Sequence, residues 1–142
     1  MQYIIAESES FDFSNLQAGL TQTLELARSI DISQVIDGGL NVRVHSLSTI
    51  GTTGSQSIKV VAYPVWVDER TGTVFSSDTA IASADIIARS PAPVAGVLLS
   101  DAFDFSVQRP AAIRVVLEAK QFSPAAALFA TLSVAVVLVT PG

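Results

Sequence analysis

The sequence contains no cysteine, and this absence excludes disulfide bonds, thiolate zinc sites and cysteine nucleophiles. Histidine occurs once, so a Ser-His-Asp site or a histidine-based metal site would have to be built around a single ring. Charged residues make up 15% of the chain, against about 25% in typical soluble domains, which leaves little solvated surface. The shortage of charge predicts buried contacts with other subunits.

Positively charged residues are scarcer than negatively charged ones: the sequence has eight lysines and arginines and thirteen acidic residues, which gives a net charge of -5. A polyanion would be repelled by this balance, so nucleic-acid binding is not expected. The first residues, MQYIIAESESFDF, lack a basic region, an apolar run of signal-peptide length and a small-residue cleavage site. These features predict a protein that is made and folded in the cytoplasm without a signal peptide.

The length of 142 residues is the usual size of one domain with its own apolar core. Residues 1–14 are expected to form an N-terminal arm or an edge strand, and residues 15–142 a single domain. Polar and apolar residues alternate with the period of a strand in several segments, namely 20–28, 40–48, 57–68 and 110–120. The region 77–89 fits a short helix and a strand about equally well.

Turn residues separate these segments and suggest how the strands connect. The turn residues 68–72 predict a hairpin between 57–68 and 73–75, with Gly72 at a positive φ. We also expect 40–48 to pair with 57–68. Pro64 should place its strand at a sheet edge or on a bulge, because proline lacks the backbone donor. About eight short strands predict an all-β fold, an antiparallel β-sandwich of jelly-roll type.

The segment Pro124–Val139 is apolar on both faces and must be covered. Ser123 and Pro124 would suit the start of a buried helix, but the β-branched residues after Ser133 favour a strand. Its 16 residues fall short of the ~20 that span a membrane, and basic flanks are lacking, so no transmembrane segment is predicted. We expect this strand to pair with 110–120 and to bury one face against a neighbouring subunit. The expected interface residues are Phe129, Thr131, Val137 and Val139, with Phe11 and Phe13 from the N-terminal segment.

Few residues suggest chemistry. His45 lies on the outward face of a predicted strand, where a solvated or interface role is expected. Asp101 and Asp104, with Asp37 or Asp31, could ligate calcium, but turn chemistry explains these residues without a metal. We therefore predict no catalytic, cofactor or metal site. Tyr63 and Trp66 could form a face for stacking sugars, although aromatic residues more often pack in cores and interfaces.

The segments Asp31–Leu47 and Arg109–Leu138 resemble those of small β-sandwich structural proteins of tailed bacteriophages, particularly head decoration or cement proteins. The resemblance implies a non-enzymatic virion protein that forms homotrimers and clamps subunits of the major capsid protein. A carbohydrate- or ligand-binding jelly-roll module, using Tyr63 and Trp66, is the alternative.

Overall fold

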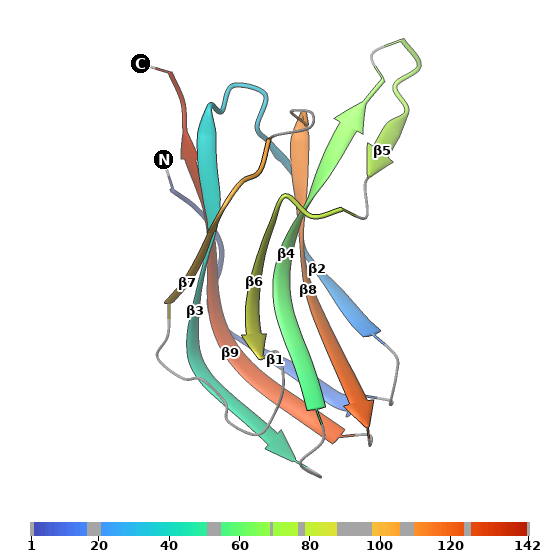
Figure 1. The fold of residues 1–142 in the computed structure, drawn as a ribbon, viewed down its shortest axis with the longest axis vertical. Coiled ribbons are helices and arrows are strands. Elements are labelled where there is room, and N and C mark those ends of the chain that lie inside the picture. The colour runs from blue at the N-terminus through green and yellow to red at the C-terminus, as the bar shows by residue number, and fades with distance from the viewer. Residues whose placement is uncertain are drawn as a thin grey trace.

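The computed structural model describes residues 2–16, 21–50, 55–68, 70–76, 79–87, 98–105, 110–123 and 126–141. These residues form two antiparallel β-sheets that face each other across an apolar core (Figure 1). Sheet A contains, in spatial order, β1 (Gln2–Leu16), β9 (Ala126–Val139), β3 (Asp37–Ile50) and β7 (Leu98–Ala102). Sheet B contains β2 (Thr21–Asp31), β8 (Ala112–Ser123), β4 (Ser55–Val67) and β5 (Val74–Ser76), with β6 (Ala82–Ile87) also paired to β4. Nothing in the described ranges is a helix long and apolar enough to cross a membrane.

The strands pair in a nested order that starts from the two ends of the chain. β1 pairs with β9, β2 with β8, β3 with β7, and β4 with both β5 and β6. Successive pairs alternate between the sheets, as in a long antiparallel hairpin that has been rolled up. This winding is that of a jelly roll and confirms the predicted fold class. The region 77–89 fitted a helix and a strand equally well, and its described part, 79–87, contributes the strand β6 (Ala82–Ile87).

Two predicted strand pairings are wrong. The segment 40–48 does not pair with 57–68, because β3 belongs to sheet A and β4 to sheet B. The apolar segment likewise does not pair with 110–120, because β9 lies in sheet A and β8 in sheet B. In both cases the two consecutive strands lie in different sheets and face each other across the core. The alternation of polar and apolar residues is the same for strands in one sheet and for strands in two facing sheets, so it could not distinguish the two arrangements. The predicted hairpin of β4 and β5 is confirmed.

β9 is a strand, as predicted, and it lies between β1 and β3 in the middle of sheet A. Its inward side chains Leu132, Val134 and Val136 are fully buried, and they share the core with Ile113 and Leu117 of β8. The outward side chains of Thr131, Ser133 and Val137 are only half-buried. The strand is therefore covered on one face by sheet B and keeps a partly open outer face.

Pro64 lies in a central strand, so the prediction of an edge or a bulge is wrong for β4 as a whole. The carbonyl of Ala62 accepts from Ile81, away from β8, and the carbonyl of Val65 accepts from Ala111, just before β8. Successive residues direct their backbone groups to opposite sides of a strand, so Pro64 shares the side of Ala62. On that side the pairing with β6 ends at Ala62 and the pairing with β5 begins at Val65. The missing donor of proline therefore costs no ladder bond.

Gly38 lies inside β3 rather than in a turn. A Cβ at this position would stand 2.5 Å from the carbonyl oxygen of Val137 and 3.0 Å from the ring of Phe103. The glycine therefore permits a close approach between β3, β9 and the segment after β7.

The edge strand β1 departs from regular pairing at three places along β9. One of them includes Ser8, whose φ of 48° lies in the left-handed region that non-glycine residues seldom adopt. The backbone N–H of Ser8 donates to the Oγ of Ser133 on β9, at 2.9 Å. The β1 edge is thus bulged rather than flat, and the bulge is held in place by a side chain of the neighbouring strand.

We predict that Leu132→Ala will lower the free energy of unfolding by about 2–5 kcal/mol, because the side chain is fully buried between the sheets. Leu98→Ala, at a position that is 55% exposed, should change it by no more than about 0.5 kcal/mol. Chemical denaturation of both variants measures the difference. Equal effects would contradict the placement of β9 at the core.

Candidate subunit interface

Exposed apolar side chains gather at one end of the sandwich. This is the end at which β1 begins and β9 finishes, since Gln2 pairs with Val137 and Asp37 with Val139. Both chain termini and β5 lie at this end in Figure 1. Of the nine large apolar residues found exposed within the described ranges, seven lie here: Tyr3, Ile4, Ile36, Val67, Val74, Phe75 and Val139. We call these seven residues the apolar end.

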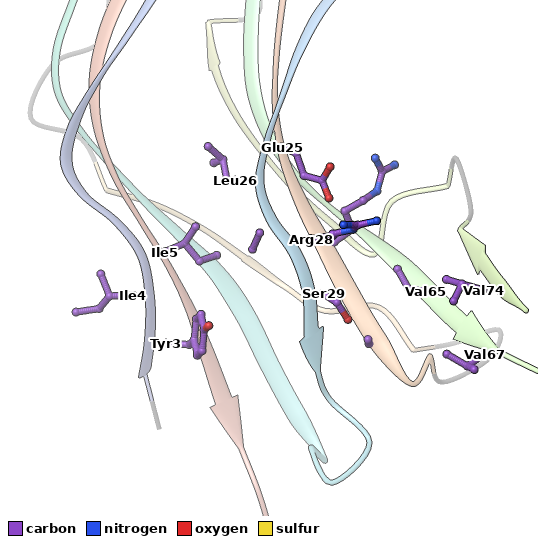
Figure 2. Close-up of a pocket in the computed structure, with 13 residues that line it drawn as sticks. Tyr3, Ile4, Ile5, Glu25, Leu26, Arg28, Ser29, Val65, Val67 and Val74 are labelled. Carbon is purple, nitrogen blue, oxygen red and sulfur yellow. The ribbon is translucent and has the colours of Figure 1, made fainter. Parts of the chain in front are cut away.

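A groove of about 650 Å³ runs through part of the apolar end. Figure 2 shows that it crosses β2, with residues of β1 on one side of that strand and residues of β4 and β5 on the other. Tyr3 and Ile5 point from β1 toward β2, whereas Val65, Val67 and Val74 line the far side (Figure 2). The groove therefore connects apolar side chains of sheet A with apolar side chains of sheet B.

The β4–β5 hairpin carries Val67 and Val74 outward. Its turn is closed by two backbone hydrogen bonds, from Asp68 N–H to Thr73 and from Gly72 N–H to Asp68. The Oδ1 atom of Asp68 accepts from the N–H of Arg70 at 3.0 Å, and Gly72 has a φ of 72°, as predicted from the sequence. Val74 is 62% exposed, so the hairpin holds apolar surface in solvent on a well-defined turn.

The connection from β2 to β3 positions Ile36 at the apolar end, on the side of sheet A. Ile32 N–H donates to Ala111 next to β8, and Ile36 N–H donates to Val139 at the end of β9. The Oδ1 atom of Asp31 accepts from the N–H of Ser33 at 2.8 Å. This backbone bond, together with the Ser33 side chain, holds the pKa of the Asp31 carboxyl below its usual value of 3.8. The connection is therefore tied to both sheets, and it presents Ile36 beside Val139.

The six predicted interface residues lie in different parts of the structure: some belong to the core, and others lie on the outer face of sheet A or at the apolar end. Phe11 and Phe13 are only 7% and 2% exposed and belong to the core, so their assignment to an interface is corrected: alternation in β1 turns both rings inward. Thr131 and Val137 lie half-buried on the outer face of sheet A, and Val139 belongs to the apolar end. Phe129 pairs through its backbone with Asp12 and Ser48, and its side chain lies outside the described part.

Most of the apolar end was not predicted from the sequence. The available signal was Val65-Trp66-Val67, which is apolar on both faces at the end of a strand, where a second sheet covers only one face. Val74 and Phe75 repeat this pattern on the return strand. A hairpin that is apolar on both faces indicates a surface covered by another molecule.

Tyr63 and Trp66 do not form a common stacking platform. Residues three apart in a regular strand face opposite sides, and the pairing of β4 is regular through both positions. The guanidinium of Arg114 lies over the Tyr63 ring, 5.3 Å from its centre, and the Tyr63 hydroxyl donates to Glu118. One face of the tyrosine is thus occupied by the protein itself, and the two rings cannot hold one sugar between them.

His45 lies on the exposed outer face of sheet A among hydroxyl groups. Its Nε2 atom is 2.7 Å from the Oγ of Ser133 and 3.4 Å from the Oγ of Ser8. Among the described residues no carboxylate is bonded to this ring. Asp31, Asp37 and Asp101 each accept a backbone N–H instead of converging, and no group of three possible metal ligands occurs in the described ranges.

We predict that Asp31→Asn will lower the melting temperature near neutral pH, because the lowered pKa means that the folded state favours the charged carboxylate. The stabilisation is present above the unfolded value and is lost as the pH falls through the folded value. The difference between Asp31→Asn and the wild type should therefore disappear well below pH 3.8. Glu9→Gln, an exposed carboxylate on β1, is the control, and an Asp31→Asn effect that persisted in acid would contradict the assignment.

No protein-family model matches the sequence, and no curated protein matches it either. The fold is similar to that of the VP2 chain in a subviral particle of infectious bursal disease virus, with a TM-score of 0.56 and 13% identity over 99% of this chain. A chain in the structure of the Gx strain of the same virus gives a TM-score of 0.52 and 18% identity over the full length. This chain spans about a third of each, at 32% and 33%. The likeness supports the two-sheet β-sandwich fold, which this chain shares with these viral chains.

Proposed function

We propose that this protein is a structural subunit of a virus particle, of the head decoration or cement type, which stabilises a shell through contacts between β-sandwiches. The observation that carries the proposal is the apolar end. Its residues come from both sheets, and Tyr3, Ile4, Val67 and Val74 line one groove. A lone soluble domain has no use for so much exposed apolar surface at one end. The capsid-like fold and the low charged fraction support the same conclusion.

The burial of the apolar end in a contact would contribute to the free energy of association, and the size of this contribution can be estimated. Full burial of a large apolar side chain yields about 1.5–3 kcal/mol, so the half-exposed residues of the apolar end contribute about 1 kcal/mol each when covered. Together they contribute about 7 kcal/mol, which is comparable with the cost of about 4–15 kcal/mol for bringing two molecules together. The apolar end alone is thus near the margin for association, and strong association requires further contacts in a larger assembly.

The proposed partners are other copies of this chain and the major capsid protein, and the proposed location is the virion. The sequence resemblance to phage cement proteins favours a homotrimer. A non-enzymatic role is supported by His45, which lies on an open face among serine hydroxyls. The carbohydrate-binding alternative is weakened by Tyr63, whose ring already contacts Arg114.

We predict that the wild-type protein forms a defined oligomer at micromolar concentration, measured by sedimentation velocity. Val74→Asp should shift it toward the monomer without unfolding it, because a carboxylate at this exposed position must be desolvated only in the assembly. Leu24→Asp is the matched control, since Leu24 is 41% exposed and lies on β2 near Phe13, away from the seven residues of the apolar end, and it should leave the oligomer intact. A wild-type protein that sediments as a monomer would remove the support for the proposal.

A further inference from the structure

The strand β1 consists of two parts that differ in how firmly they are anchored. The part after the bulge carries Phe11 and Phe13, whose rings are buried in the core. The part before the bulge is residues 2–6, which we call the arm. Within the arm only the methyl group of Ala6 is buried, Ile5 is half-buried, and the first three side chains are exposed. The arm is therefore held to the molecule mainly by its backbone pairing with β9.

A strained and polar link joins the arm to the anchored part. Between Ala6 and Glu9 the pairing with β9 shifts register, which places Glu7 and Ser8 in a bulge. Ser8 has a φ of 48°, a strained conformation for a residue other than glycine, and an exposed glutamate lies on each side of it. The Ser8 N–H donates to the Oγ of Ser133 at 2.9 Å, across the irregular part of the ladder. This bulge has the properties of a hinge, because a rotation at Ser8 would relieve strain.

The balance that keeps the arm on its own β9 is close. A backbone hydrogen bond contributes about as much to stability as the ordering of one residue of a free chain costs. The exposed side chains of the arm add little apolar burial to this balance. Release of the arm also allows the backbone of Ser8 to relax. The arm is thus the part of β1 that leaves the sheet at the smallest cost.

We propose that the arm is exchanged between copies of this chain, so that residues 2–6 of one copy pair with residues 134–137 of a second copy. In the exchanged state Tyr3 and Ile5 of one copy line the groove of its neighbour. The arm starts at the apolar end, where both chain termini lie (Figure 1). The inference rests on the proposed function, because it names how copies of the same subunit associate.

The second copy is selected as the partner because the two pairing surfaces are identical. The arm finds the same β9, with the same register, on a neighbouring copy, so exchange requires no new complementary surface. A strand from another protein would have to match the register shift at the bulge and place a small residue opposite Val134, as Ala6 does. Residues 2–8 span about 23 Å when extended, which limits the exchange to copies in direct contact.

The test uses disulfide bonds, which the cysteine-free sequence makes unambiguous. The variant Ile4→Cys with Ala135→Cys places two thiols at directly opposite positions of the arm and β9, beside one hollow on the outer face. Opposite residues of an antiparallel pair have Cα atoms about 4.5–5.5 Å apart, which a disulfide bond spans. After oxidation of the assembled protein with oxidised glutathione, most chains should run as covalently joined chains on a denaturing gel, and reductant should separate them.

The variant Ser10→Cys with Thr131→Cys is the matched control, because it uses the same two strands and the same face beyond the hinge. The hydroxyl oxygens of these two residues are 3.1 Å apart. The buried phenylalanine rings anchor this part of β1, so oxidation should close the disulfide within one chain. Opposite thiols in one chain react with each other before they react across a contact, because their effective concentration is higher.

A second pair guards against a variant that folds poorly. If the thiols at 4 and 135 lower the melting temperature of the reduced protein, Gln2→Cys with Val137→Cys replaces them, since these residues are also directly opposite. The expected result is the same, because both pairs join the arm to β9. The wild type is measured beside the variants by sedimentation velocity.

The outcomes separate the two proposals. Joined chains from the arm pair, together with single chains from the control pair, support the exchange. Single chains from both pairs in an oligomeric protein would overturn this inference and leave the proposed function standing. Joined chains from both pairs would also overturn it, because the linkage would then not depend on the hinge. A monomeric wild type would overturn both proposals, since an exchanged arm requires a second copy.

Discussion

The fold depends on the pairing of the two ends of the chain in the middle of sheet A. β9 is bonded to β1 on one side and to β3 on the other, so the last strand is held between the first and the third. Its inward side chains, Leu132, Val134 and Val136, meet Ile113 and Leu117 from sheet B. Every inner pair of the roll lies within this outermost pair, which means that the core is complete only when the C-terminal strand is in place.

The two outer faces of the sandwich are closed by different means. On sheet A, the outward positions of β9 carry Thr131 and Ser133, whose hydroxyls bond to Ser10, His45 and the Ser8 backbone. On sheet B, Val61 and Val116 are buried beside the Tyr63, Arg114 and Glu118 side chains. Polar groups therefore cover much of both faces, and seven of the nine exposed large apolar residues in the described ranges lie at the apolar end.

Sequence patterns predicted the fold class and most of the strands, because alternation and turn residues act locally, but they left β6 open between helix and strand. They also predicted the Gly72 turn and the strand character of 126–139. They could not predict the pairing, since alternation in 40–48 and 57–68 shows that one face is buried but not which sheet each strand joins. The interface prediction failed at Phe11 and Phe13 for a related reason. Phenylalanine is common both in cores and in interfaces, so residue type alone does not separate the two. The structure shows that both rings face inward and pack in the core between the sheets.

The bulges of β1 bear on how such a protein survives at high concentration. A long, flat, unpaired edge would template endless addition of further strands, and the product would be a fibre. The irregular pairing around Ser8 breaks the straight row of donors and acceptors that such growth requires. The β1 edge is therefore a poor template for strand addition, and the proposed association through the apolar end meets less competition from growth along this edge.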